Sequence, residues 1–241
     1  MMNLIKKIKQ KKLFIFDLDG TLVDSIDTWN EIDRSSIKKA GDTPRQTLGI
    51  EKKTFFNTCT ESDIYGKYER YLYDSYELNC DIEEFCEYRK YFTLLYLSQN
   101  VSLINGADKM LNFLKQNNYM LALATSSGRL AYDTYITKNK NILSLINFDD
   151  YFASNVFTKE DVKNTKPSPD VYLKLKAKFK LKRSDIIIIE DSKAGVIAAN
   201  SAGIECICIR EFHSICDEDF LKKNSILYIN SYDEFMGLLE F

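Results

Sequence analysis

Short apolar runs alternate along the chain with longer segments in which apolar residues recur every three or four positions. The runs have the length of a β-strand. They occur at Leu13–Phe16, Met120–Ala124, Ile186–Ile189, Cys206–Ile209 and Ile226–Ile229, with a weaker candidate at Tyr151–Val156. Because successive residues within each run are apolar, helices should cover both faces of these strands, which is typical of a parallel sheet. The pattern therefore predicts an α/β fold with a doubly wound, mostly parallel sheet.

The segment between Asp24 and Gly106 departs from this alternation, because it has no aliphatic run of strand length but has apolar residues at helical spacing. Two aromatic-rich faces recur at steps of three and four residues: Tyr65, Tyr68, Leu72 and Tyr76, then Phe85, Tyr88, Phe92 and Leu95. We expect these faces to pack the helices of an inserted α-helical domain against one another. The predicted division is therefore a core of residues 1–23 and 106–241 and an inserted domain of residues 24–105.

Carboxylate side chains follow two of the predicted strands directly. The first strand runs into Asp17 and Asp19, and Gly20 permits the backbone to turn sharply after them. The strand Ile186–Ile189 runs into Glu190 and Asp191. Ligand sites of open α/β sheets form at the carboxyl ends of the strands, so we expect these carboxylates to share one site.

Hydroxyl groups and a lysine occupy two further positions of interest. The strand Met120–Ala124 ends in Thr125 and Ser126, whose hydroxyl and backbone amide groups are suited to holding phosphate oxygens. Lys166 precedes Pro167 and can supply a fixed positive charge. Carboxylates, hydroxyls and a lysine at one edge of a sheet predict a site for a divalent metal and a phosphoryl group.

Several segments follow one another in an order that is known from an enzyme family. DLDGT at residues 17–21, the strand-terminal Thr125, KPSPD at residues 166–170 and EDSKAGVIAANSAG at residues 190–203 resemble the motifs of the haloacid dehalogenase-like hydrolase superfamily. Residues 24–105 look like the helical cap of the subfamily that contains β-phosphoglucomutase and phosphoglycolate phosphatase. The resemblance implies a Rossmann-like core that carries the catalytic residues, with the cap inserted into it.

The resemblance also implies a role for each residue singled out above. Asp17 would be the nucleophile, and Asp19 the general acid and base. Thr125 and Lys166 would hold the phosphoryl group, with Ser126 in the same phosphate-binding loop. The ligands of Mg²⁺ would be Asp17, the backbone carbonyl of Asp19, Glu190 and Asp191.

These roles imply a Mg²⁺-dependent phosphatase that hydrolyses a small phosphorylated metabolite, a phosphate monoester, by way of a phosphorylated Asp17. Asp19 argues against the dehalogenase and phosphonatase members of the superfamily, which lack an aspartate at that place. A β-phosphoglucomutase-like isomerase stays an alternative, although Trp29 occupies the place where the mutase pattern has a cap histidine. A phospho-accepting signalling module also uses an aspartate at a strand end, but the second carboxylate pair and the insert disfavour it.

Composition and charge exclude other classes of protein. The chain has 241 residues, with 33 lysines and arginines against 35 aspartates and glutamates, so it has no overall positive field for nucleic acid or an anionic membrane. No apolar run reaches the ~20 residues of a membrane span, and no cleavage site follows the N-terminus, so we expect a cytoplasmic enzyme. We interpret the lysines among residues 6–12 as a solvated lead-in to the first strand. Nothing in the sequence indicates an oligomeric state.

The remaining candidate residues carry weaker signals. His213 lies in a polar segment and is not expected to act in catalysis, and Trp29 is expected to pack at the entrance of the cap. Lys52, Lys53 and Arg70 are candidates for substrate recognition, although solvated positions on helices are the simpler interpretation. The cysteines show no metal-binding spacing and are expected to be reduced and mostly buried. They are Cys59, Cys80, Cys86, Cys206, Cys208 and Cys216.

Overall fold

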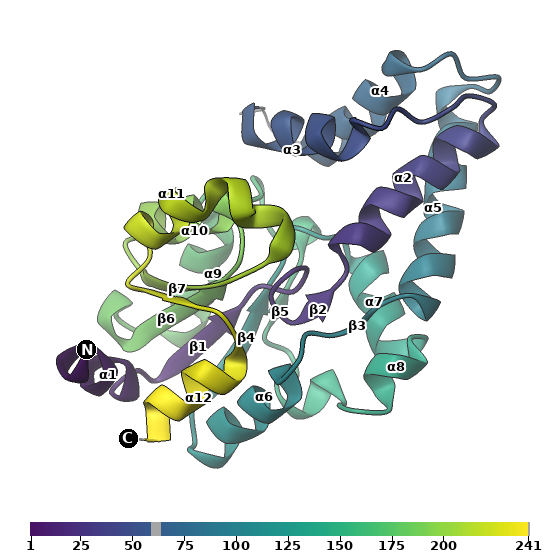
Figure 1. Ribbon diagram of the computed structural model, residues 1–241. Coiled ribbons are helices and arrows are strands. Elements are labelled where there is room, and N and C mark those ends of the chain that lie inside the picture. The colour runs from purple at the N-terminus through teal and green to yellow at the C-terminus, as the bar shows by residue number, and fades with distance from the viewer. Residues whose placement is uncertain (59–63, 241) are drawn as a thin grey trace.

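The computed structural model describes residues 1–58 and 64–240 and has a six-stranded parallel sheet at its centre (Figure 1). The strand order is β5-β4-β1-β6-β7-β8. These strands are β1 (Leu13–Phe16), β4 (Met120–Ala124), β5 (Val156–Phe157), β6 (Ile186–Glu190), β7 (Glu205–Ile209) and β8 (Leu227–Ile229). The order of the strands reverses at β1, which has β4 on one side and β6 on the other. The predicted doubly wound parallel sheet is confirmed.

Alternate residues of the strands face two separate apolar layers. Phe14 and Phe16 of β1 face one layer, and Leu13 and Ile15 face the other. The first layer contains α1 (Met2–Lys9), α6 (Ala107–Gln116), α7 (Arg129–Thr137), α8 (Lys140–Leu143) and α12 (Tyr232–Glu240). The second contains α9 (Asp170–Phe179), α10 (Lys193–Ala202) and α11 (Glu218–Asn224). Helices on both faces account for the apolar character of successive strand residues.

Short 3-10 helices lie in the connections between these elements. They are η1 (Phe148–Asp150), η2 (Lys159–Asp161), η3 (Arg183–Asp185) and η4 (Phe212–Asp217). One of them, η4, follows β7 and is in contact with the inserted segment.

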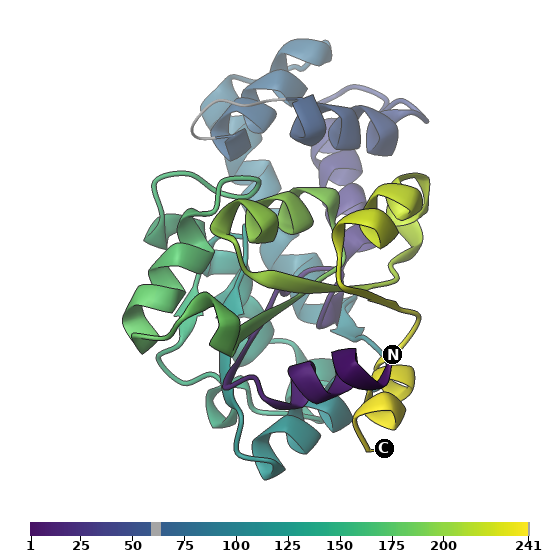
Figure 2. The ribbon, with the colours of Figure 1, turned by 90° about the vertical axis from the view of Figure 1, so that its left-hand side faces the viewer.

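The inserted segment leaves and rejoins the core through a two-stranded antiparallel ribbon, β2 (Val23–Asp24) and β3 (Ser102–Leu103). Between these strands are α2 (Ile26–Lys39), α3 (Leu48–Thr58), α4 (Ile64–Ser75) and α5 (Ile82–Gln99). Helices α2 and α5 lie side by side, and α3 and α4 lie at their far end (Figures 1 and 2). The exact boundaries 1–23, 24–105 and 106–241 stay a prediction.

The aromatic faces of the insert pack largely as expected. Tyr68, Leu72, Tyr76 and Phe85 are buried together in an apolar cluster between the helices of the insert. Tyr65 is different, because its side chain shares a hydrogen bond with Ser126 of the core.

Two elements differ from the prediction. The weak strand expected at Tyr151–Val156 is wrong, because residues 151–154 form a turn and the strand, β5, begins at Val156. Helix α1 stands where a solvated lead-in was expected. It forms because Ile5 and Ile8 share one face and are buried, while the lysines cover the rest of the helix.

Lys11 also differs from the prediction of a solvated lead-in. Its side chain is buried, and its ammonium group lies 2.6 Å from a carboxylate oxygen of Glu205 and donates to the carbonyl oxygen of Ser184 at 2.9 Å. A buried ammonium group needs such partners. Local sequence does not reveal this position, because Glu205 comes from β7, far along the chain.

The cysteines are less buried than expected. Cys206 and Cys208 of β7 are buried, Cys80 and Cys86 are half-buried, and Cys216 is exposed. All of these are free thiols. Cys59 lies outside the described residues. Across the described ranges, no helix combines the length and the apolar character needed to cross a membrane.

Candidate active site

The candidate site lies at the carboxyl ends of the three central strands. The strands β1, β4 and β6 run in register, with Phe16 paired both to Leu123 and to Ile189. Asp17 and Thr125, which follow β1 and β4, therefore emerge close together. This is the place where the strand order reverses, and ligand sites of open α/β sheets form there.

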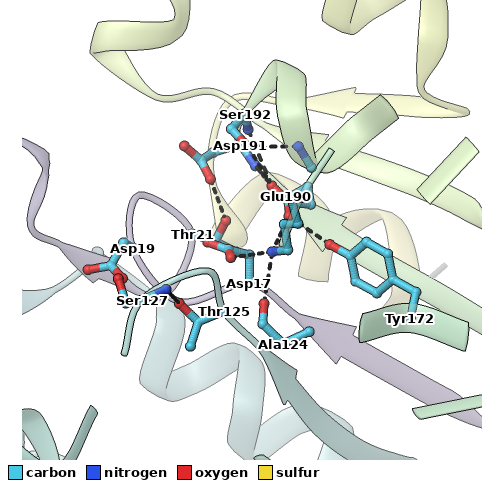
Figure 3. A network of polar contacts seen from close by, with 12 residues as sticks. Asp17, Asp19, Thr21, Ala124, Thr125, Ser127, Tyr172, Glu190, Asp191 and Ser192 are labelled. Atoms are coloured by element: carbon cyan, nitrogen blue, oxygen red, sulfur yellow. Dashed lines mark hydrogen bonds and ion pairs between the residues drawn. The ribbon is translucent and has the colours of Figure 1, made fainter. Parts of the chain in front are cut away.

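Three buried carboxylates, Asp17, Glu190 and Asp191, lie close together at these strand ends (Figure 3). Oxygen atoms of Asp17, Glu190 and Asp191 lie within 4.8 Å of one another. The ammonium group of Lys166 lies 2.5 Å from Oδ1 of Asp17 and 2.5 Å from Oε1 of Glu190. It also donates to the carbonyl oxygen of Ala124 at 2.8 Å. The fold thus brings together the lysine and three of the carboxylates that the sequence singled out.

Hydroxyl groups orient both members of the second carboxylate pair. Tyr172 donates to Oε1 of Glu190 at 2.7 Å, and Ser192 donates to Oε2 at 3.0 Å. Thr21 donates to Oδ1 of Asp191 at 2.9 Å. From the sequence, no role was expected for these three residues. Thr21 and Ser192 lie within the recognised motifs, whereas Tyr172 comes from α9 and carried no signal.

Two glycines permit the backbone to approach these carboxylates closely. Gly20 has a φ of +87°, and a Cβ atom there would lie 2.4 Å from Oδ2 of Asp191. A Cβ atom at Gly195 would lie 1.9 Å from the carboxyl carbon of Glu190. Any larger residue at either place would displace a carboxylate, which explains why glycine occurs in DLDGT and in EDSKAG.

Burial sets the electrostatics of the cluster. Burial raises the pKa of Asp17 to about 8, opposed by the charge of Lys166 and reinforced by the charges of Glu190 and Asp19. Burial also raises the pKa of Asp191 well above its ordinary value, and the charges of Asp17 and Glu190 add to this. For Lys166, burial alone would lower the pKa, but the neighbouring carboxylates outweigh it and the net direction is upward. One ammonium group therefore does not neutralise the cluster.

These shifts predict that metal-free protein loses stability as pH rises. Between its unfolded-state and folded-state pKa values, a carboxyl whose pKa is raised by folding binds more protons in the folded protein than in the unfolded protein. For Asp17, the resulting contribution to the free energy of unfolding is therefore lost as the pH rises from about 4 to about 8. We expect the unfolding free energy of EDTA-treated protein to fall by roughly 2–4 kcal/mol from about pH 5 to about pH 8. Urea unfolding at the two pH values measures this change.

The variant Asp17→Asn serves as the control for this prediction. Asparagine does not titrate, so the variant should show a clearly smaller fall and should be at least as stable as the wild type at about pH 8. Equal falls in the two proteins would contradict the raised pKa of Asp17.

The side chain of Asp19 lies apart from the carboxylate cluster (Figure 3). Its Oδ1 accepts hydrogen bonds from the Ser25 hydroxyl at 2.6 Å, the Trp29 indole at 2.9 Å and the Tyr135 hydroxyl at 2.8 Å. Its Oδ2 accepts from the Ser127 hydroxyl at 2.6 Å. Trp29 thus does more than pack at the cap entrance. The expected metal contact of Asp19, through its backbone carbonyl, stays a prediction.

The predicted phosphate-binding loop contacts both Asp19 and the insert. Thr125 is buried, and its Oγ1 accepts a hydrogen bond from the backbone amide of Ser127 at 2.9 Å. Ser126 is half-buried and shares a hydrogen bond with the side chain of Tyr65 from α4. Burial raises the pKa of Tyr65, so this phenol stays neutral at ordinary pH. An aromatic residue that was expected only to pack between helices therefore reaches the candidate site.

Lys52 and Arg70, both candidates for substrate recognition, occupy very different places. The ammonium group of Lys52 lies 2.9 Å from the carboxylate of Asp33, whose side chain is fully buried. The expected solvated position is therefore wrong for Lys52. Arg70 is exposed and pairs with Asp74 on the same helix at 2.9 Å, as a solvated helix charge should.

Lys53 and His213 form contacts between the insert and η4. The ammonium group of Lys53 lies 2.7 Å from Oδ2 of Asp217. Nε2 of His213 lies 3.1 Å from Oδ1 of Asp27 at the start of α2. Both contacts join the insert to the core and lie outside the carboxylate cluster.

Comparison with known proteins identifies a family and several relatives. Residues 14–209 match the family model described as "Haloacid dehalogenase-like hydrolase". The chain is 28% identical over 232 residues to a phosphorylated carbohydrates phosphatase of Thermotoga maritima, covering 94% of this chain and 97% of that protein. It is 27% identical over 244 residues to a bifunctional riboflavin kinase/FMN phosphatase of Arabidopsis thaliana, covering all of this chain but only 56% of that protein.

A solved structure has the same fold. The crystal structure of CbbY from Rhodobacter sphaeroides, in complex with phosphate, superposes with a TM-score of 0.77. The match covers 96% of this chain and 100% of that one at 17% sequence identity. At this identity the likeness establishes the fold.

Proposed function

The chain belongs to the haloacid dehalogenase-like hydrolase family, and we propose that it is a Mg²⁺-dependent phosphatase acting on a small phosphorylated metabolite. The observation that carries this proposal is the buried cluster of Asp17, Glu190 and Asp191 at the reversal of strand order, with Lys166 paired to Asp17 and Glu190. The substrate is a phosphate monoester, and the reaction proceeds through a phosphorylated Asp17. The phosphatase named among the relatives, with phosphorylated carbohydrates as its substrates, supports this class of reaction.

The donor set of the cluster fits Mg²⁺. The carboxylate oxygens of Asp17, Glu190 and Asp191 would hold the ion, together with the backbone carbonyl of Asp19. Hard oxygen ligands of this kind are the ones that Mg²⁺ prefers. Buried carboxylates with raised pKa values are also the groups that a cation stabilises in their charged form. When bound, Mg²⁺ reduces the repulsion between the phosphate dianion and the attacking carboxylate.

Five residues of the chain carry out the two half-reactions. Asp17 attacks phosphorus, forming a bond to one carboxylate oxygen while the bond to the leaving oxygen breaks. Lys166 orients Asp17 and balances part of the phosphate charge, and Thr125 and Ser126 hold the phosphate oxygens. Asp19 gives a proton to the leaving oxygen, then takes one from the water that attacks the phosphorylated Asp17. Phosphate is released and both aspartates return to their starting forms.

The insert, residues 24–105, is the cap that covers the leaving group. Contacts between Tyr65 and Ser126 and between Lys53 and Asp217 support this arrangement, because they join the insert to the core beside the site. A cap over the site excludes bulk water while the first half-reaction takes place.

The test is phosphate release from a panel of monoesters that includes sugar phosphates, nucleotides and phosphoglycolate, each with Mg²⁺ and with EDTA. We expect release from at least one ester, only with Mg²⁺. For β-glucose 1-phosphate, glucose 6-phosphate is followed together with free phosphate. Glucose 6-phosphate formed without free phosphate would establish the mutase alternative, and no reaction with any ester would overturn the proposal.

A further inference from the structure

The two carboxylate oxygens of Asp19 accept different numbers of hydrogen bonds. Oδ1 accepts three hydrogen bonds, from Ser25, Trp29 and Tyr135, and Oδ2 accepts one, from Ser127. The donors to Oδ1 come from two directions. Ser25 and Trp29 belong to the start of α2 in the insert, whereas Tyr135 belongs to α7 of the core.

Two of the three donors on Oδ1, Trp29 and Tyr135, present their hydrogen from an aromatic ring, whereas the third, the Ser25 hydroxyl, can rotate. The indole N–H of Trp29 can only donate. The side chain of Tyr135 is fully buried, and a phenol, with an ordinary pKa of about 10, is neutral at physiological pH. The Tyr135 hydroxyl therefore keeps its proton and can continue to donate to Oδ1.

The environment of Oδ2 is more adaptable. Its partner is the hydroxyl of Ser127, which can rotate and can accept as well as donate. Ser127 also belongs to the loop after β4, because its backbone amide donates to Oγ1 of Thr125. Oδ2 is thus the oxygen on the side of the phosphate-binding loop.

We propose that Tyr135 and Trp29 are positioning residues that anchor Oδ1 of Asp19, so that Oδ2 is the atom that exchanges the proton with the leaving oxygen and with water. The inference rests on the proposed function, in which Asp19 is the general acid and base. In the first half-reaction the proton moves from Oδ2 to the leaving oxygen as the bond from that oxygen to phosphorus breaks. In the second it moves from the attacking water to Oδ2.

The proposal predicts a loss that depends on the leaving group. The variant Tyr135→Phe keeps the ring and removes the donor, so Asp19 loses one fixed contact but stays in place. We expect kcat for an alkyl phosphate to fall about 10–100-fold, because transfer to a basic alkoxide needs good alignment. With p-nitrophenyl phosphate, whose leaving group needs little protonation, the loss should be below about threefold, and KM should stay within about twofold for both esters.

Tyr132 provides a matched control on the same helix. It is also buried, and no hydrogen bond from its hydroxyl group is found among the described residues. Tyr132→Phe should leave both esters unaffected. Trp29→Phe should repeat the pattern of Tyr135→Phe, with the alkyl ester the more affected.

The melting temperature of each variant shows whether a loss of turnover comes from a destabilised fold or from the missing hydrogen bond to Asp19. Equal losses on the two esters in Tyr135→Phe, or a loss matched by Tyr132→Phe, would overturn the inference. So would unchanged alkyl phosphate turnover in both Tyr135→Phe and Trp29→Phe. The alkyl phosphate is the one of the monoester panel that the wild type hydrolyses fastest. A wild-type protein that hydrolyses no ester of that panel would overturn the proposed function itself, and with it the role of Asp19.

Discussion

Replacing Asp17 with asparagine is expected to lower the rate of phosphate release from p-nitrophenyl phosphate by more than ~10³-fold, about 4 kcal/mol of barrier. The amide of asparagine is a poor nucleophile and cannot form the acyl phosphate. The change is nearly isosteric, so Lys166 can keep its contacts with Glu190 and with the carbonyl of Ala124. Turnover with saturating Mg²⁺ and substrate measures the effect.

The exposed residue Asp149 supplies the matched control for this substitution. Asp149→Asn makes the same chemical change away from the site and should leave turnover unaltered. Activity of Asp17→Asn within about tenfold of the wild type would remove Asp17 as the nucleophile. Because burial raises the pKa of Asp17, the variant is also expected to fold normally, so a large loss is not to be explained by unfolding.

The second large effect is expected for Asp19→Asn and depends on the substrate. General acid catalysis contributes about 10²–10⁴-fold when the leaving group is basic, so turnover of an alkyl phosphate should fall by roughly 10³-fold. An acyl phosphate such as acetyl phosphate releases a carboxylate that needs no proton, and its phosphoryl transfer should fall much less. The asparagine oxygen can still accept from Trp29 and Tyr135, so its position should be kept.

A rapid-mixing experiment isolates the first half-reaction of Asp19→Asn, because Asp19 also activates water in the second. Release of the leaving group in the first turnover is compared for the alkyl and the acyl phosphate. Equal losses in that step would contradict the role of Asp19 as the acid. Asp24→Asn, at an exposed position of β2, is the control and should behave as the wild type.

Much of the core and of the site could be predicted because the signals are local. The apolar runs specify strands that are covered on both faces, and Asp17 and Glu190 lie at the ends of two of them. Once the strands are parallel and in register, such residues must gather at one edge of the sheet. The family membership and the class of phosphoric monoester hydrolase follow from these motifs and are confirmed by the comparisons.

The hydrogen bonds that Tyr135 and Tyr172 donate in the site could not be predicted. They depend on the position of each helix in the fold, which the neighbouring residues in the sequence do not reveal. Tyr135 and Tyr172 are aromatic residues on amphipathic helices, and their sequence surroundings are those of ordinary packing residues. Only the packing of α7 and α9 against the sheet turns their hydroxyl groups toward Asp19 and Glu190.

The same distinction applies to the charged residues. From the sequence, Lys11 and Lys52 look like solvated lysines, since nearby residues reveal neither burial nor a partner. Their partners, Glu205 and Asp33, come from other elements of the fold. The sequence by itself determined the sheet, the motif residues and their order, because hydrophobic periodicity and strand ends are properties of short segments. The tertiary structure decided which side chains meet, because a hydrogen bond or ion pair between distant segments forms only when packing brings its two atoms within about 3 Å.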